Sequence, residues 1–83
     1  MEEKIEQIQD ILTEISEDRT VPKNIREKSS EVKKILNSSE EVRVKLDKAL
    51  QIIDEISEDQ NIPTYTRTQI WGVASILESI THE

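Results

Sequence analysis

The acidic string EISED occurs twice in this sequence, at residues 14–18 and 55–59. Carboxylates grouped this closely could bind a metal ion or serve as a general acid and a general base. Which of these they do depends on the elements that hold them. The carboxylates concerned are Glu14, Glu17, Asp18, Glu55, Glu58 and Asp59.

Neither copy has the pattern of a metal site or of an active site. An EF-hand calcium loop needs alternating oxygen ligands, a central glycine and a closing glutamate over about twelve residues. The chain has no cysteine, which excludes thiolate ligands, disulfides and a cysteine nucleophile. Its one histidine, His82, lies beside the C-terminus, and its one glycine, Gly72, lies in an expected helix. The sequence therefore predicts no catalytic residue, no metal, no cofactor and no small-molecule substrate.

The two acidic strings belong to a longer internal repeat with a period of 41 residues. Shifting the sequence by this period also superimposes the two prolines, two arginines and several aliphatic residues downstream of them. A period of about 40–47 residues is typical of two-helix units. We expect one domain over residues 1–83, with the first repeat at about 1–38 and the second at about 39–83. The identical positions in the first copy are Ile11, Glu14, Ile15, Ser16, Glu17, Asp18, Pro22, Arg26, Val32, Ile35, Leu36 and Ser38.

Apolar residues recur at three- and four-residue spacing in four segments, which predicts four amphipathic helices. The first should run from about Glu2 to Glu17. The second and fourth should begin at Pro22 and Pro63, because proline suits the first turn of a helix. The third should have Ser38 or Ser39 as its N-cap. The fold class is therefore all-α: a four-helix domain built from two αα-hairpins.

Within this fold the acidic strings become the joints of the hairpins. Asp18 and Asp59 can accept amide hydrogens just before the next helix begins. Arg26 and Arg67, one turn into that helix, are the expected ion-pair partners of the acidic residues. Metal binding and partner binding are the alternatives to this structural interpretation. The turn residues are Asp18, Pro22, Arg26, Asp59, Pro63 and Arg67.

Positive charge gathers in the middle of a chain whose net charge is −7. A basic stripe on the second helix could contact phosphates, alone or within a ribonucleoprotein. Interleaved glutamates and the lack of aromatic residues in this region make nucleic-acid binding the weaker hypothesis. The stripe consists of Lys23, Arg26, Lys28, Lys33 and Lys34.

The fourth helix is apolar around much of its circumference, and it departs from its own repeat at two positions. Trp71 replaces Ser30, and Tyr65 replaces Asn24. Core burial is the default interpretation of this helix. The alternative is a binding interface containing Tyr65, Trp71 or Ile76. Gly72 suggests a close approach of another helix.

The segments EISEDRTVPKNIR and EISEDQNIP, followed by Arg67 and the pair Ile70–Trp71, resemble an archaeal family of small proteins, uncharacterised protein family 147. The resemblance covers nearly the whole chain and implies an all-helical fold in an archaeal cytoplasm. It implies no activity. No apolar run reaches the length needed to span a bilayer. We therefore expect a non-enzymatic interaction or adaptor module that binds a protein partner or associates with itself, away from membranes.

Overall fold

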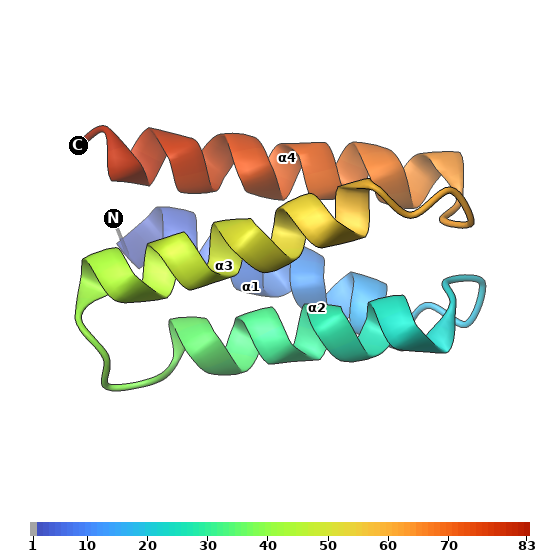
Figure 1. Cartoon of the computed structure of the whole chain (residues 1–83), viewed down its shortest axis with the longest axis horizontal. Helices are drawn as coiled ribbons and strands as arrows, with labels where there is room; N and C mark the ends of the chain where they lie inside the picture. Colours follow the sequence, from blue (N-terminus) through green and yellow to red (C-terminus); the bar gives the residue numbers. More distant parts are fainter. Residues whose placement is uncertain (1) are drawn as a thin grey trace.

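The structure, a computed structural model, describes residues 2–83 and contains four α-helices joined by short turns (Figure 1). The predicted all-helical fold and the expected bounds of the first helix are confirmed. Residue 1 of the expected domain lies outside the described residues. The helices are α1 (Glu2–Glu17), α2 (Lys23–Leu36), α3 (Val42–Ser57) and α4 (Thr64–Thr81).

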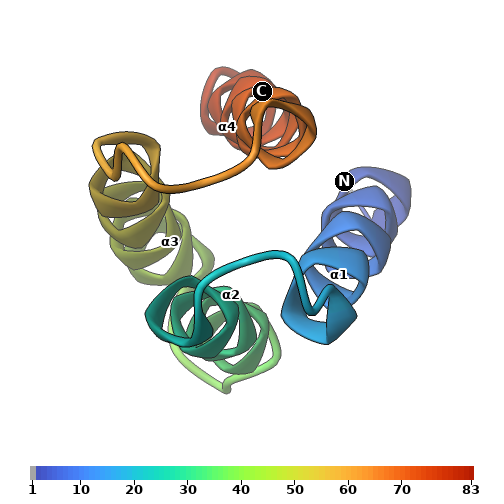
Figure 2. The ribbon, with the colours of Figure 1, turned by 90° about the vertical axis from the view of Figure 1, so that its right-hand side faces the viewer.

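The helices pack as a ring in which each contacts two neighbours. Successive helices are in contact, and α4 returns to contact α1, which closes the ring. The end-on view in Figure 2 shows the four helices around a common centre. Both acidic turns lie at one end of the bundle, while the α2–α3 connection, the start of α1 and the C-terminus lie at the other (Figure 1).

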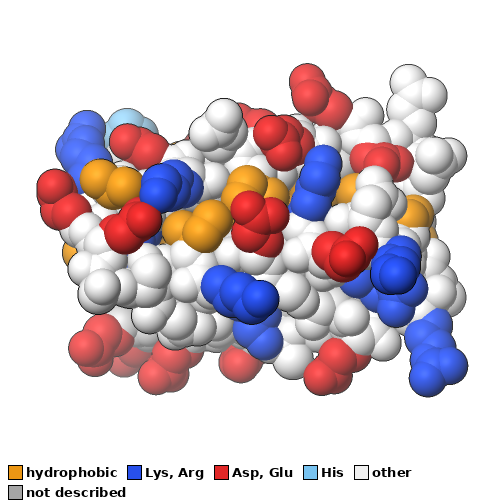
Figure 3. Space-filling model, turned by 60° about the horizontal axis from the view of Figure 1, so that its bottom comes forward, with side chains coloured by type: hydrophobic (Ala, Val, Ile, Leu, Met, Phe, Trp, Pro, Cys, Tyr) orange, Lys and Arg blue, Asp and Glu red, His pale blue; other side chains and the backbone are white. Residues whose placement is uncertain are grey.

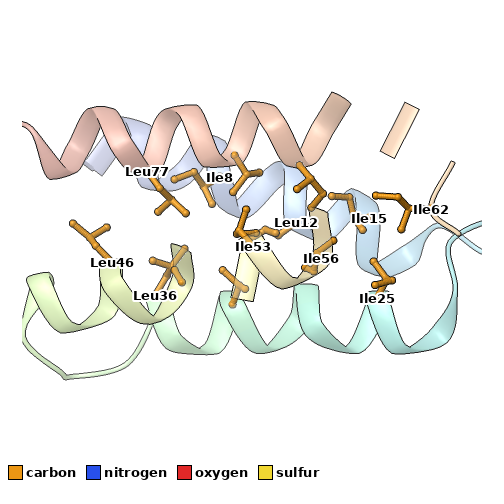
Figure 4. Close-up of a cluster of buried hydrophobic side chains, with 14 of the residues drawn as sticks. Ile8, Leu12, Ile15, Ile25, Leu36, Leu46, Ile53, Ile56, Ile62 and Leu77 are labelled. Carbon is orange, nitrogen blue, oxygen red and sulfur yellow. The ribbon is translucent and has the colours of Figure 1, made fainter. Parts of the chain in front are cut away.

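The centre of the ring is filled almost entirely by aliphatic side chains. Ile8, Leu12 and Ile15 from α1 are completely buried, as are Ile53 and Ile56 from α3. Figure 4 shows these side chains pointing toward one another from different helices. Fully burying one such side chain stabilises a fold by about 1.5–3 kcal/mol. The core therefore sets the positions of the helices, and with them the polar side chains outside.

Two hydroxyl side chains also lie in this core. Ser29 of α2 and Thr66 of α4 are completely buried, and neither hydroxyl has a hydrogen-bond partner within residues 2–83. The residues 41 positions away are both isoleucines, Ile70 and Ile25. Each pair of core positions 41 residues apart thus holds one isoleucine and one small hydroxyl residue, with the isoleucine in α2 in one pair and in α4 in the other.

The helix starts differ from the predicted ones in detail. Pro22 and Pro63 are N-caps and not first helical residues, with ψ angles of 146° and 152°. Each proline carbonyl accepts the amide of the arginine four residues later, at 3.0 Å. The predicted N-cap of the third helix is wrong: α3 begins after Glu41, and the Ser38 hydroxyl donates instead to the Ile35 carbonyl at 2.8 Å. Ser38 thus bonds to the last turn of α2 and does not begin α3.

The interpretation of Gly72 is also wrong. A Cβ atom at this position would meet no atom of another element within 4 Å. No close helix–helix approach therefore requires a glycine here, and the residue lowers the helix propensity of α4 without a packing gain.

We expect Gly72→Ala to raise the free energy of unfolding by up to about 1 kcal/mol, because alanine loses less backbone entropy in a helix. Chemical denaturation would measure this. Ser75→Gly, at an exposed position of the same helix, is the control and should lower the stability. A destabilised Gly72→Ala protein would show that the position does require glycine.

Candidate functional site

The acidic residue at the end of each repeated string stabilises its own turn. Asp18 accepts hydrogen bonds from the amide and the hydroxyl of Thr20, at 2.9 and 2.6 Å. The hydroxyl bond, and then the amide bond, lower the pKa of the Asp18 carboxyl. In the second turn Asp59 accepts the amide of Asn61 at 2.7 Å. Both carboxylates therefore bond an amide within the turn rather than one in the following helix.

The two arginines of the turns behave differently from each other and from the expected ion pairs. Arg67 donates to the carbonyls of Ser57 and Asp59, each at 2.9 Å, and so caps the C-terminal end of α3. Within residues 2–83 neither Arg67 nor Arg26 forms an ion pair, which corrects the prediction. The Nε atom of Arg26 is buried and has no hydrogen-bond partner in this part of the chain.

A cation from the following helix caps α2 as well as α3. The Lys45 ammonium donates to the carbonyl of Ser38 at 2.9 Å and lies 3.4 Å from that of Leu36. Such donors satisfy carbonyls that have no partner inside the helix and oppose the negative end of its dipole. Arg26 of α2 follows α1 as Lys45 follows α2, but within residues 2–83 it makes no such contact with the end of α1.

The carboxylates do not converge on a metal site. Within residues 2–83, no three Asp, Glu or His side chains are grouped so that they could hold a metal ion.

Over the same residues, none of the four helices combines the length and the hydrophobicity that crossing a bilayer requires.

The predicted basic stripe on α2 is divided by its own contacts. Lys28 faces α3, where its ammonium lies 3.7 Å from the Glu55 carboxylate. Lys33 faces α1 and donates to the Thr13 hydroxyl. Figure 3, which faces the side of the molecule formed by α2 and α3, shows basic side chains interspersed with acidic ones. The stripe is therefore not a continuous positive band.

The other three basic residues share a groove of about 520 Å³ beside the end of α1. Lys23, Arg26 and Lys34 follow one line along α2, and Ser30 lies between them, because three- and four-residue steps stay on one helix face. Glu27 and Glu31 line the groove as well. The groove is lined by Ser16, Lys23, Arg26, Glu27, Ser30, Glu31 and Lys34.

The two aromatic side chains of α4 are both exposed, but they lie on different sides of the helix. Trp71 is 60% exposed and Tyr65 is 63% exposed, so the default interpretation of core burial is wrong for Trp71. Six residues at about 100° each place them about 120° apart around the axis. Trp71 shares the side of Arg67, which contacts α3, whereas the Tyr65 hydroxyl donates to Glu14 of α1 at 3.1 Å.

Ile76 belongs with Tyr65. Eleven residues separate them, which returns the helix to within about 20° of the same direction. Ile76 is partly buried and packs against the core. The three candidate interface residues therefore form two surfaces, with Tyr65 and Ile76 at the α1–α4 seam and Trp71 by itself on the α3 side.

One apolar surface was not predicted from the sequence. Val42 lies four residues before the buried Leu46, yet it is 41% exposed, and Val44 is 40% exposed. Val42, Leu46 and Leu36 line a groove of about 390 Å³ with Ile5 at the end of the bundle opposite the acidic turns. The signal in the sequence was the Val-Arg-Val order, which places two valines on different sides of a helix.

Comparison with known proteins shows clear relatives. A sequence profile described as Uncharacterised protein family (UPF0147) matches residues 1–80. The chain is 38% identical to a UPF0147 protein of Archaeoglobus fulgidus over 79 residues, which cover 95% of this chain and 91% of that protein.

Two crystal structures are similar to this fold. One, of a protein from uncharacterized family UPF0147 of Thermoplasma acidophilum, has a TM-score of 0.91 at 30% identity and covers 95% of this chain and 94% of that one. The other is of a protein of unknown function, with a TM-score of 0.86 at 47% identity over 92% and 88% of the two chains.

The difference between the two arginines predicts different effects on stability. Arg67→Gln should lower the free energy of unfolding by about 1–2 kcal/mol, because it removes a cationic donor from two helix carbonyls. Arg26→Gln should not lower it, because no contact in the structure is lost and a buried donor without a partner is removed. Parallel denaturation curves would measure both. Equal losses would mean that Arg26 also caps a helix.

The hydrogen bond to Glu14, followed by the charge of that carboxylate, raises the pKa of the Tyr65 phenol above its ordinary value of 10.0. As the chain has one tyrosine, phenolate absorbance reports this group alone. Glu14→Gln should lower the pKa, and Glu6→Gln, at an exposed position elsewhere on α1, should not. Because the folded-state pKa is the higher one, the bond stabilises the fold below about pH 10 and this stability is lost as pH rises through the folded-state pKa. An unchanged pKa in Glu14→Gln would contradict the contact.

Proposed function

The chain belongs to the uncharacterised protein family UPF0147, and from this premise we propose that it is a non-enzymatic protein-interaction module that binds through Trp71. The observation that carries the proposal is the 60% exposure of this side chain on the outer side of α4. A tryptophan offers about 150–250 Å² of apolar surface for burial and has only two side-chain torsions to restrict. Exposed aromatic anchors of this kind dominate many interfaces.

The surroundings of Trp71 support its assignment as the anchor. Tyr65, equally exposed, already uses its hydroxyl to join α4 to α1. Arg67, one turn before Trp71, is fixed by two hydrogen bonds to the end of α3. Trp71 therefore projects from a helix whose first turns are held in place, and a rigid anchor loses little entropy when a partner binds.

The distribution of polar groups gives less support to the alternative of nucleic-acid binding. Two of the five residues of the basic stripe, Lys28 and Lys33, are engaged with neighbouring helices. The remaining three share their groove with Glu27 and Glu31, whose charges would repel a phosphate backbone. Neither exposed aromatic side chain lines that groove, so bases would find no stacking surface there.

We also propose that the two αα-hairpins are copies of one unit. The identities at a spacing of 41 residues support this, as do the equivalent prolines that precede α2 and α4. In that interpretation the positions of Ser30 and Trp71 are equivalent, and the two copies have diverged there. The binding surface is then a feature of one hairpin and not of both.

The proposal is tested by comparing Trp71→Ser with Val44→Ser, at another exposed apolar position, on α3. Both variants should unfold within about 0.5 kcal/mol of the parent chain. Proteins that copurify with the tagged chain from its native cell should be retained by Val44→Ser and reduced at least about tenfold by Trp71→Ser. Sedimentation of the purified chain at several concentrations would show whether the partner is a second copy.

Two results would refute this assignment. One is a Trp71→Ser variant that keeps the same partners and the same self-association. The other is a loss of more than about 2 kcal/mol of stability in Trp71→Ser, which would give the side chain a role in folding.

A further inference from the structure

Arg26 lines the groove, and its guanidinium has no acceptor within residues 2–83. Position 26 corresponds to position 67 in the 41-residue register, and there the guanidinium donates to the carbonyls of Ser57 and Asp59. Arg26 is half-buried and contacts neither the corresponding carbonyls nor any carboxylate within residues 2–83, and its Nε atom is buried without a partner. An unpaired buried donor is unfavourable, and a guanidinium without any acceptor gains by turning toward one that enters the groove.

The residues around Arg26 leave room for that acceptor. Ser30, at the position where the fourth helix carries Trp71, is small and lies between Arg26 and Lys34 in the same groove. Lys23 lies at the other end of the line, and neither lysine is hydrogen-bonded or ion-paired within the described residues. Three cationic side chains thus surround a hollow of about 520 Å³ on the surface.

We propose that this groove binds the carboxylate of an aspartate or glutamate side chain of a protein partner, with Arg26 as the principal donor. The inference rests on the proposed function, since it assumes a protein partner, but it concerns a different surface. A planar carboxylate matches the paired donors of a guanidinium in a way that a single ammonium does not. Lys23 and Lys34 attract the acidic side chain to either end of the same line.

The two glutamates of the groove disfavour the binding of a polyanion. Glu27 and Glu31 also line the groove, so a chain of closely spaced phosphates would place negative charge against them. A peptide that carries one carboxylate among neutral or basic groups meets no such repulsion and could use both glutamates as acceptors. Discrimination of this kind needs a repulsive element as well as an attractive one.

The groove also lies apart from Trp71. The line of cations runs along α2 beside α1, whereas Trp71 lies on the α3 side of α4, and α2 and α4 occupy opposite positions in the ring (Figure 2). An acidic segment in the groove and an apolar segment against Trp71 would therefore bind on opposite sides of the domain. The two contacts can be removed one at a time.

The test is a titration of the labelled full chain, with the Nε–H resonances of its four arginines followed by NMR. The probe is the blocked tripeptide acetyl-Gly-Glu-Gly-amide, and its glutamine analogue is the matched control. The Arg26 signal should shift saturably with the glutamate peptide and not with the glutamine peptide, while the signal of the exposed Arg43 stays in place. Arg26→Gln should weaken binding about tenfold, as followed by amide shifts of Ser30.

Three outcomes would overturn the proposal. In the first, Arg26 moves no more than Arg43 up to about 50 mM peptide. In the second, inorganic phosphate shifts Arg26 as strongly as the glutamate peptide does, which would make the groove a general anion site. In the third, oligothymidylate binds and the peptide does not. The titration needs only the parent chain, so it remains decisive even if a variant fails to fold.

The result is separable from the Trp71 proposal. Trp71→Ser should leave the tripeptide titration unchanged, and Arg26→Gln should leave a partner held only by Trp71 in place. Failure of the titration would therefore refute the acidic-peptide site without refuting the Trp71 surface.

Discussion

Each helix of this domain has one stripe of aliphatic side chains that must be buried away from water. The four stripes meet in a single column, and the rest of the structure depends on this shared burial. Only 34% of the residues are hydrophobic, so few positions are left to bury a second surface. Side chains such as Leu12 and Ile53 each contribute about 1.5–3 kcal/mol on burial. Exposed ion pairs such as Lys28–Glu55 contribute only about 0–1 kcal/mol. The packing of the core therefore determines where the charged side chains lie, because the ion pairs contribute too little to determine the packing.

With the core fixed, the polar side chains are free to differ between positions that the 41-residue period makes equivalent. Arg67 donates to the end of α3, whereas Arg26 lines an open groove and its buried Nε atom has no acceptor within residues 2–83. Trp71 projects from the surface of α4, whereas Ser30 lines a hollow on the surface of α2. Neither exchange disturbs the column of aliphatic residues, because both occur at its rim. Two dissimilar surfaces are therefore compatible with one packing scheme.

The helices could be predicted from the sequence because a helix reveals its buried face by its period. The spacing of Ile5, Ile8, Leu12 and Ile15 determines the bounds and orientation of α1 with no knowledge of its neighbours. The exposure of Trp71 could not be predicted in this way, because a residue beside the stripe is buried or exposed according to how far the next helix reaches over it.

The partners of individual polar groups were harder still to predict. Sequence spacing correctly placed Arg26 and Arg67 near the turns, but it could not distinguish a carboxylate from a carbonyl as acceptor. That choice depends on where helix ends lie in space. Ser38 shows the same limit, since a serine before a helix can equally end the preceding one. The apolar groove around Val42 arises only where three helix ends meet, and no local pattern encodes it.

The ring of helices also has a kinetic meaning. Three of its four seams join helices that follow one another in the chain, so they form between segments separated by only a few residues. The seam between α1 and α4 is different, because closing it requires the two distant ends of the chain to meet. Hydrogen bonds from Lys4 to Ser79 and from Tyr65 to Glu14 span this seam at its two ends. Loop closure over long separations costs the most entropy, so this seam should close last in folding and open first in a fluctuation. The domain thus consists of four helices that each pack on the next one in the chain, and the contacts between α1 and α4 join the first helix to the last.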